Sequence, residues 1–188
     1  EMSLDIDYVK SVCDGSTTRE NQVDFIHLMS RYYPIDPYRL LFYKDDSMFG
    51  VKITRASTSR ATSRVFKRKT SKNNSLSAYY EYRDTAMSAH SPFRPEWIKM
   101  LRIVNDNDPD NSDAIYNNGH FLHQNTFFVG PVNFYYKIDG ISYCEEMVTG
   151  DSNYITPFIP HTFTSRSRDE EALIIAVTYA GASTFLGP

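Results

Sequence analysis

The sequence is poor in cysteine and has no long hydrophobic run. Its only cysteines, Cys13 and Cys144, cannot build a disulfide framework and fit a reducing compartment. No apolar stretch approaches the roughly 18 residues that a membrane span needs, and the mean hydropathy is −0.46. No charged-then-apolar leader opens the chain. These absences predict a soluble, cytoplasmic protein without a membrane partner.

Tryptophan occurs once, against 14 tyrosines and 12 phenylalanines, and the runs that hold these aromatic residues also hold Val, Ile and Thr. This mixture favours strands. The first fifty residues differ, because apolar residues at helical spacing predict a helix over 20–33, capped by Ser16 or Thr17, and a shorter helical turn over 8–12. We therefore expect a helical appendage or connector over residues 1–48 and one β domain over 49–188. The chain begins with Glu1 rather than Met, so we also expect that it can be a piece of a longer protein.

Short segments separated by turn signals make up the second part of the chain. The strongest hairpin signal is Asp139-Gly140, which stands between two alternating Tyr-rich segments. About ten short strands without intervening helices predict a mainly β fold, an antiparallel sandwich or small barrel. The expected strands cover residues 51–55, 63–70, 77–83, 98–104, 120–129, 132–138, 142–149, 152–157, 162–165 and 172–179.

Positive charge is concentrated in one stretch, although the net charge of the chain is only −3. Residues 51–73 hold eight Lys or Arg and no acid, which leaves 12 basic and 23 acidic residues elsewhere. Such a stretch indicates a solvated strand face, a site for a small anion, or nucleic acid. No nucleic-acid-binding motif accompanies it, so we expect no nucleic-acid partner. The basic residues are Lys52, Arg55, Arg60, Arg64, Lys67, Arg68, Lys69 and Lys72.

Two histidines and a glutamine form the candidate site. On a strand, His120 and Gln124 would share one face while His123 points to the other. With His161 from a later strand, two imidazoles and an amide oxygen would converge, much as non-haem Fe(II) is held by two histidines and a third, usually carboxylate, ligand. The pattern alone also fits packed polar side chains without a metal, and a carboxylate from 145–146 is a further alternative.

Several separated motifs resemble one family of enzymes. They are the segments 79–82 (YYEY), 105–110 (NDNDPD), 117–120 (NNGH) and 160–164 (PHTFT). In order and spacing they are similar to the phosphonate-specific cupin oxygenases, and the resemblance covers residues 76–180. It implies a cupin fold (a double-stranded β-helix, or jelly-roll barrel) with a small N-terminal helical segment, an Fe(II) cofactor and a homo-oligomer.

The ligand positions discriminate within this family. Its epoxidases carry a glutamate ligand four residues after the first histidine, where this chain has Gln124. Its dioxygenases carry one six residues before the last histidine, where this chain has Ile155. The chain thus resembles the methylphosphonate-forming members, which implies His120, Gln124 and His161 as iron ligands, with Ile155 beside them.

The resemblance also implies a substrate and a reaction. Asn117 and Tyr82 match family residues that bind the phosphonate, whereas the family arginine falls on Asn74, so that Lys72 or another residue of the basic stretch would replace it. The implied reaction cleaves the C–C bond of 2-hydroxyethylphosphonate with O2 to give methylphosphonate and CO2 or bicarbonate. The alternatives are a dioxygenase that gives hydroxymethylphosphonate and formate, a non-redox anion-binding cupin, and a sugar-phosphate isomerase.

Overall fold

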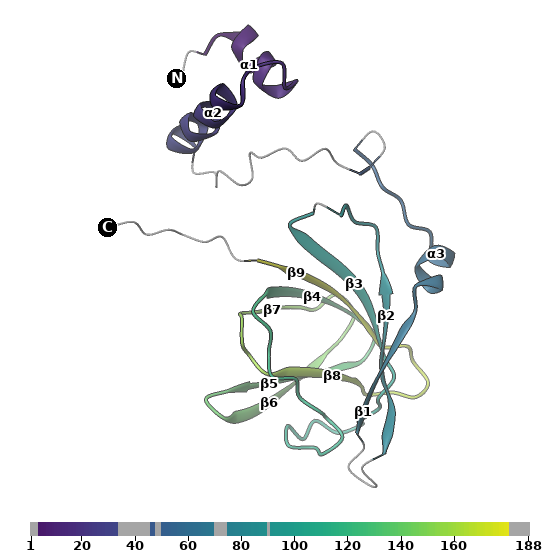
Figure 1. Cartoon of the computed structure of the whole chain (residues 1–188). Helices are drawn as coiled ribbons and strands as arrows, with labels where there is room; N and C mark the ends of the chain where they lie inside the picture. The colour runs from purple at the N-terminus through teal and green to yellow at the C-terminus, as the bar shows by residue number, and fades with distance from the viewer. Residues whose placement is uncertain (1–3, 34–45, 48–49, 70–74, 90, 181–188) are drawn as a thin grey trace. The chain divides into compact units, whose positions relative to one another are not determined.

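The structure is a computed structural model that describes residues 4–33, 46–47, 50–69, 75–89 and 91–180 (Figure 1). The chain divides into two compact units, Glu1–Asp46 and Ser47–Gly187. Within the described ranges, no helix has the length and apolar character needed to cross a membrane. The candidate site belongs to the second unit.

The described part of the first unit contains two helices, α1 (Ile6–Cys13) and α2 (Arg19–Tyr32). The expected helix is present, but its predicted cap was wrong, because Thr18 is the N-cap and its hydroxyl accepts a hydrogen bond from the Asn21 N–H at 3.2 Å. The Thr17 hydroxyl instead contacts the side-chain amide of Asn21. A cap must have extended backbone next to the first helical residue, and Thr18 occupies that position.

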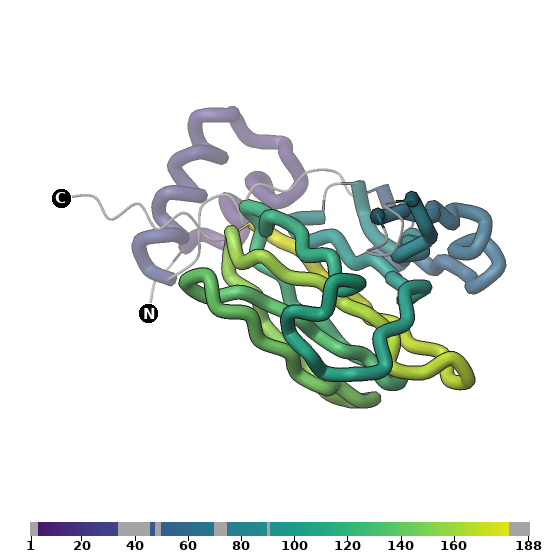
Figure 2. Tube along the Cα trace, turned by 90° about the horizontal axis from the view of Figure 1, so that it is seen from below, coloured from purple at the N-terminus to yellow at the C-terminus, as the bar shows by residue number. Residues whose placement is uncertain are grey.

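The second unit is a pair of antiparallel sheets with one short helix, α3 (Ala56–Ala61). The larger sheet has the order β1-β2-β3-β9-β4-β7 and the smaller one β6-β5-β8. After β4 the chain passes back and forth between the two sheets, as Figure 2 shows. The mainly β prediction is therefore confirmed. The strands are β1 (Arg64–Lys69), β2 (Leu76–Asp84), β3 (Phe93–Met100), β4 (His123–Val129), β5 (Val132–Ile138), β6 (Ile141–Met147), β7 (Ser152–Ile155), β8 (His161–Ser165) and β9 (Leu173–Tyr179).

Three strand predictions differ from the structure. The segment 51–55 is not a strand, because Val51 and Ile53 are both largely exposed and no apolar face is buried there. Strand β3 runs over Phe93–Met100 rather than 98–104. Its early part contains Pro95, which pairs with β9 but lies beyond the pairing with β2, so its missing N–H is tolerated. Strand β4 begins at His123, which leaves His120 outside it.

The core lies between the two sheets and is largely aromatic. Phe134 stacks on Phe163 with ring centroids 5.2 Å apart, and Phe128 packs against both. The buried hydroxyls of Tyr79 and Tyr80 both contact the hydroxyl of Thr162, at 2.9 and 2.8 Å. These bonds tie β2 to β8 across the sandwich, which fixes the distance between the two walls of the site.

The predicted hairpin is confirmed. Asp139 and Gly140 join β5 to β6 with φ angles of 51° and 80°. Positive φ at both central residues matches the twist of the flanking strands.

Candidate metal centre

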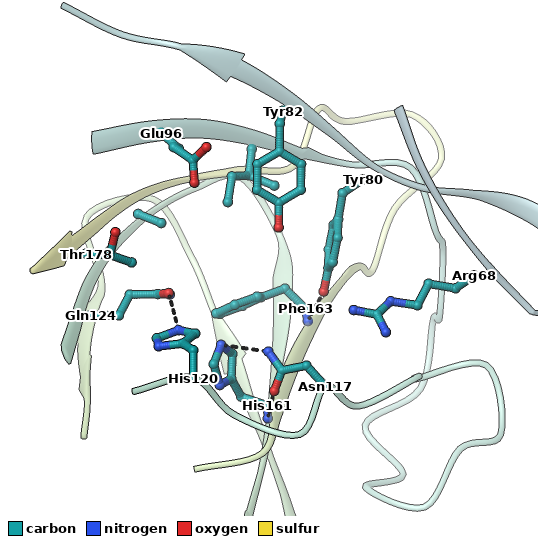
Figure 3. A pocket seen from close by; sticks show the side chains of 12 residues that line it. Arg68, Tyr80, Tyr82, Glu96, Asn117, His120, Gln124, His161, Phe163 and Thr178 are labelled. Atoms are coloured by element: carbon teal, nitrogen blue, oxygen red, sulfur yellow. Dashed lines mark hydrogen bonds between the residues drawn. The ribbon is translucent and has the colours of Figure 1, made fainter. Parts of the chain in front are cut away.

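A cavity of about 140 Å³ opens between the sheets (Figure 3). Five strands of the larger sheet and β8 of the smaller one supply most of its lining. The remaining residues come from the loop that precedes β4. The lining residues are Arg68, Tyr80, Tyr82, Glu96, Ile98, Asn117, His120, Gln124, His161, Phe163, Ala176 and Thr178.

His120 reaches this cavity from a loop, not from a strand. The strand-face argument for it was wrong, yet its Nε2 lies 3.2 Å from Oε1 of Gln124. Gly119, with φ of +74°, makes the turn possible, because a Cβ there would lie 2.6 Å from the backbone of Phe158. The Phe158 N–H then donates to the His120 carbonyl at 2.8 Å. The loop is thereby held against the segment that leads to β8.

Backbone carbonyls determine the protonation of both histidines. His120 Nδ1 lies 2.8 Å from the carbonyl of Leu122, and His161 Nδ1 lies 2.8 Å from that of Ile159. Since a carbonyl only accepts, each Nδ1 carries a proton, and a ring that is neutral then has its lone pair on Nε2. Burial, together with the nearby His120, lowers the pKa of His161 to about 4, so this ring is neutral at pH 7.

Gln124 presents its amide oxygen to the same point. Its Nε2 donates to the buried hydroxyl of Thr126 at 2.9 Å, which directs Oε1 toward His120. His120 Nε2 lies 3.2 Å from that oxygen. The ring of His161 lies 5.2 Å from that of His120. When both imidazoles are neutral, their Nε2 atoms and the amide oxygen of Gln124 are acceptors that would suit a bound cation.

A three-ligand metal site at this position requires Gln124 as one of the ligands. No group of three or more His, Cys, Asp or Glu side chains that could hold a metal occurs in the part of the chain that the structure describes. Two neutral imidazoles and an amide oxygen form an N,N,O set, which suits a borderline divalent metal and adds no negative charge.

Asn117 also lies where the sequence placed it, in the cavity wall. Its Oδ1 accepts from the N–H groups of Gly119 and His161 at 2.8 and 2.9 Å. Its Nδ2 therefore points inward and lies 3.2 Å from Nε2 of His161. A metal that took the lone pair of this histidine would free the Asn117 amide to donate to a ligand.

Tyr82 points its hydroxyl into the cavity (Figure 3). Burial, and secondarily the negative charge of Glu96, raise the pKa of Tyr82 to about 12. The ring packs on Phe66 with centroids 4.7 Å apart. Tyr82 is thus held as a neutral hydrogen-bond donor.

The cation predicted at Lys72 lies outside the described residues, but Arg68 from the same basic stretch lines the cavity. Its guanidinium lies 5.9 Å from the ring centroid of Tyr79, and none of the ion pairs within the described ranges involves it. A register shift between Phe66 and Lys67 interrupts β1 just before Arg68. Such a bulge leaves no pattern in a single sequence, so the residue could not be singled out.

Glu96 and Thr178 are further cavity residues that the sequence did not reveal. They also line a second, adjoining cavity of about 410 Å³, together with Tyr82 and His120. The sequence offered one indication of the position of Glu96. Side chains alternate between the two faces of a strand, so Glu96 lies on the same face of β3 as the buried Ile98.

The remaining candidates lie away from the cavity. His123 stacks between Tyr154 and Tyr179 on the opposite face of β4, as its position in the strand predicted. Ile155 is buried directly beside Gln124 in the register of β4 and β7, but it does not line the cavity. Burial raises the pKa of Cys144 to about 11, which argues against a nucleophile.

The alternative carboxylate at 145–146 is also absent from the site. Both glutamates are exposed on β6, and neither lines the cavity.

Comparison with known proteins places these features in context. No family model matches the chain. The chain is 41% identical over 186 residues to the methylphosphonate synthase of Nitrosopumilus maritimus, and the match covers 98% of this chain and 39% of that protein. It is 42% identical to Streptomyces albus HEPD, solved with 2-hydroxyethylphosphonate and Fe(II) bound, with a TM-score of 0.69 over 96% of this chain and 39% of that one.

More distant structures agree on the fold. HppE, solved as its Fe(II) form with (S)-1-HPP, is 20% identical with a TM-score of 0.54, over 88% of this chain and 77% of that one. The expected cupin fold is therefore confirmed, and the similarity to phosphonate enzymes that the motifs indicated extends over nearly the whole chain. The chain spans about two fifths of the length of its two more similar relatives.

Proposed function

We propose that this chain forms the iron-binding catalytic cupin of an oxygenase that cleaves the C–C bond of 2-hydroxyethylphosphonate. One carbon leaves as CO2 or bicarbonate, the other is retained as methylphosphonate, and O2 is the oxidant. The observation that carries the proposal is that His120, Gln124 and His161 line one cavity, and each donates a hydrogen bond to a group other than these three. The names of its relatives support this choice of substrate and metal.

These three side chains would hold Fe(II) and leave its remaining coordination positions to substrate and dioxygen. When bound, Fe(II) would supply the activation of dioxygen. The protein contributes a fixed donor set, because Leu122 and Ile159 hold the imidazole tautomers by their carbonyls. Such supporting bonds orient metal ligands and increase their basicity.

The phosphonate would be bound by donors that surround the metal position. Arg68 provides a cation without an acidic partner among the described contacts, and the hydroxyl of Tyr82 and the Asn117 amide provide neutral donors. Charge-assisted bonds from a guanidinium are among the strongest that a phosphonate can accept. The position of Arg68 in the cavity therefore favours a small-anion site among the three interpretations of the basic stretch 51–73.

Apolar side chains complete the cavity. Phe163, Ile98 and Ala176 line it, and all three are nearly buried. They would contact the two-carbon chain of the substrate and exclude water from the reacting carbon. A volume of about 140 Å³ is compatible with a small ligand such as 2-hydroxyethylphosphonate.

A second product outcome has a specific observation in its favour. The relative solved with 2-hydroxyethylphosphonate and Fe(II) is as similar to this chain as the methylphosphonate synthase is. The dioxygenase reaction would give hydroxymethylphosphonate and formate from the same substrate. Gln124 and Ile155, neither of which supplies a carboxylate, favour methylphosphonate.

Phosphorus NMR of a single reaction tests the proposal. The chain is loaded with Fe(II) without oxygen, mixed with 2-hydroxyethylphosphonate, and then exposed to O2. We expect methylphosphonate from the wild type and from His123→Ala, and no product from His161→Ala. Hydroxymethylphosphonate alone would identify the dioxygenase, while binding without any product would leave a non-redox anion-binding cupin.

A further inference from the structure

The cavity contains one carboxylate, although its proposed substrate is a dianion. Glu96 lies on β3 and lines both the inner cavity and the adjoining outer one. Arg68 and Glu96 stand on opposite sides of the inner cavity, and His120, Gln124 and His161 lie below Glu96 in the view of Figure 3. The two charges make the cavity strongly polar from one side to the other.

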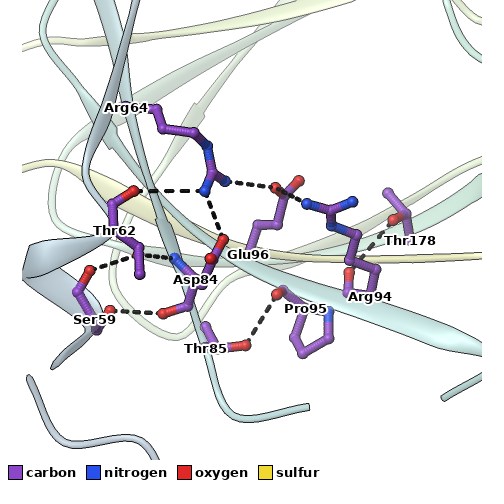
Figure 4. A network of polar contacts seen from close by, with 9 residues as sticks. All are labelled: Ser59, Thr62, Arg64, Asp84, Thr85, Arg94, Pro95, Glu96 and Thr178. Carbon is purple, nitrogen blue, oxygen red and sulfur yellow. Dashed lines mark hydrogen bonds and ion pairs between the residues drawn. The ribbon is translucent and has the colours of Figure 1, made fainter. Parts of the chain in front are cut away.

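Two arginines form ion pairs with Glu96. Arg64 and Arg94 both approach Oε1, at 3.4 and 3.6 Å, and the side chain is only 20% exposed (Figure 4). Arg64 is anchored in turn by Asp84 at 2.7 Å. Both ion pairs therefore engage the same oxygen of Glu96.

The second oxygen of Glu96 is free to act on a ligand. Neither hydrogen bonds nor ion pairs of the described residues involve Oε2, since both arginines contact Oε1. The neighbouring donor, Tyr82, is near enough for the charge of Glu96 to raise its pKa. Oε2 can therefore accept one further hydrogen bond inside the cavity, and it opposes any second negative charge there.

We propose that Glu96 determines specificity at the carbon end of the substrate. With the phosphonate at Arg68, the carbon chain extends toward the Glu96 side, where a neutral hydroxyl can donate to Oε2. A phosphonate that carries a carboxylate in place of this hydroxyl would meet the like charge of the Glu96 carboxylate, which repels it. Glu96 thus selects hydroxyalkylphosphonates and rejects carboxyalkylphosphonates of similar size. This inference rests on the proposed function.

Binding to the anaerobic, Fe(II)-loaded chain tests it. Calorimetry at pH 8 compares 2-hydroxyethylphosphonate with phosphonoacetate, in which a carboxylate replaces the CH2OH group. The Glu96→Gln substitution keeps the shape and removes the charge. We expect it to tighten phosphonoacetate about tenfold or more and to weaken 2-hydroxyethylphosphonate by about threefold or less.

Glu171→Gln is the matched control, because Glu171 pairs with Lys99 and lies outside both cavities. It should leave both affinities unchanged. If the wild type binds 2-hydroxyethylphosphonate but Glu96→Gln has the same ratio of the two affinities as the wild type, the proposed role of Glu96 is wrong. The proposed function would not be affected by this result. Failure of the wild type to bind 2-hydroxyethylphosphonate would overturn both.

Discussion

The floor of the cavity, formed by His120, Gln124 and His161, differs in chemistry from its sides, which carry Arg68 and Glu96. The floor presents nitrogen and oxygen atoms of His120, Gln124 and His161, and each of these side chains is oriented by a hydrogen bond on its far side. The sides present full charges, Arg68 and Glu96. The difference indicates that holding the metal depends on fixed lone pairs, whereas selecting the substrate depends on where charge is placed.

Removing a floor ligand should have the largest effect. His161→Ala takes away one of three candidate ligands, so Fe(II) affinity should fall about a hundredfold or more. His123→Ala is the matched control, since that ring stacks outside the cavity. An anaerobic Fe(II) titration measures the affinity of both variants. Equal losses of Fe(II) affinity in His161→Ala and His123→Ala would show that His161 is not a specific metal ligand.

Removing a side charge should spare the metal and weaken the substrate. Arg68→Gln should reduce the affinity for 2-hydroxyethylphosphonate about tenfold to a hundredfold, because it loses a charge-assisted contact. Lys67→Gln, at the exposed neighbouring position, is the control. Calorimetry on Fe(II)-loaded protein checks this, and a parallel loss of Fe(II) from Arg68→Gln would contradict the separation of roles.

Loosening a floor ligand should have an intermediate effect. Thr126→Val removes the acceptor that fixes the Gln124 amide while preserving the shape of a fully buried side chain. The amide would then be free to turn its nitrogen inward, and Fe(II) affinity should fall about tenfold. Unchanged affinity in a folded variant would show that the orientation of Gln124 does not depend on Thr126.

Tyr82 should give the smallest effect, through the pH dependence of stability. Its pKa is raised to about 12, so the unfolded chain, with an ordinary tyrosine, loses this proton first. Stability is therefore fully present below pH 10 and is lost as the pH rises toward 12. Tyr82→Phe should lack this loss and gain about 1 kcal/mol relative to the wild type between pH 9 and 11. Urea unfolding of both proteins at pH 9 and pH 11 measures this change. If the free energies of unfolding of Tyr82→Phe and the wild type differ by the same amount at both pH values, the hydroxyl of Tyr82 is not desolvated.

The sequence predicted the parts of the site that depend on local pattern. The hairpin at Asp139-Gly140, most of the strands and the position of Asn117 followed from residue types and from family-like motifs. His120 was placed in the right cavity for the wrong reason, because the turn at Gly119 does what strand alternation was expected to do. Local rules therefore located the residue without describing its backbone.

The sequence could not predict that Arg68 and Glu96 line the cavity, for a physical reason. Arg68 faces the cavity after an irregularity in the pairing of β1 and β2, which depends on contacts across strands. Glu96 is a charged residue of the kind that usually faces solvent on a strand. Its ion pairs are with Arg94 on its own strand and with Arg64, which the pairing of β1 with β2, and of β2 with β3, brings close. Pairing between distant segments determines both positions.

The most direct test of the central claim identifies the atoms on the metal. Pulsed electron paramagnetic resonance of the nitric oxide adduct of the Fe(II)-loaded chain reports imidazole nitrogens bound to iron. We predict two coupled imidazoles in the wild type and in His123→Ala, and one in His120→Ala or His161→Ala if iron is retained at high concentration. Three imidazoles in the wild type, or a signal that His161→Ala leaves unaltered, would contradict the proposed centre.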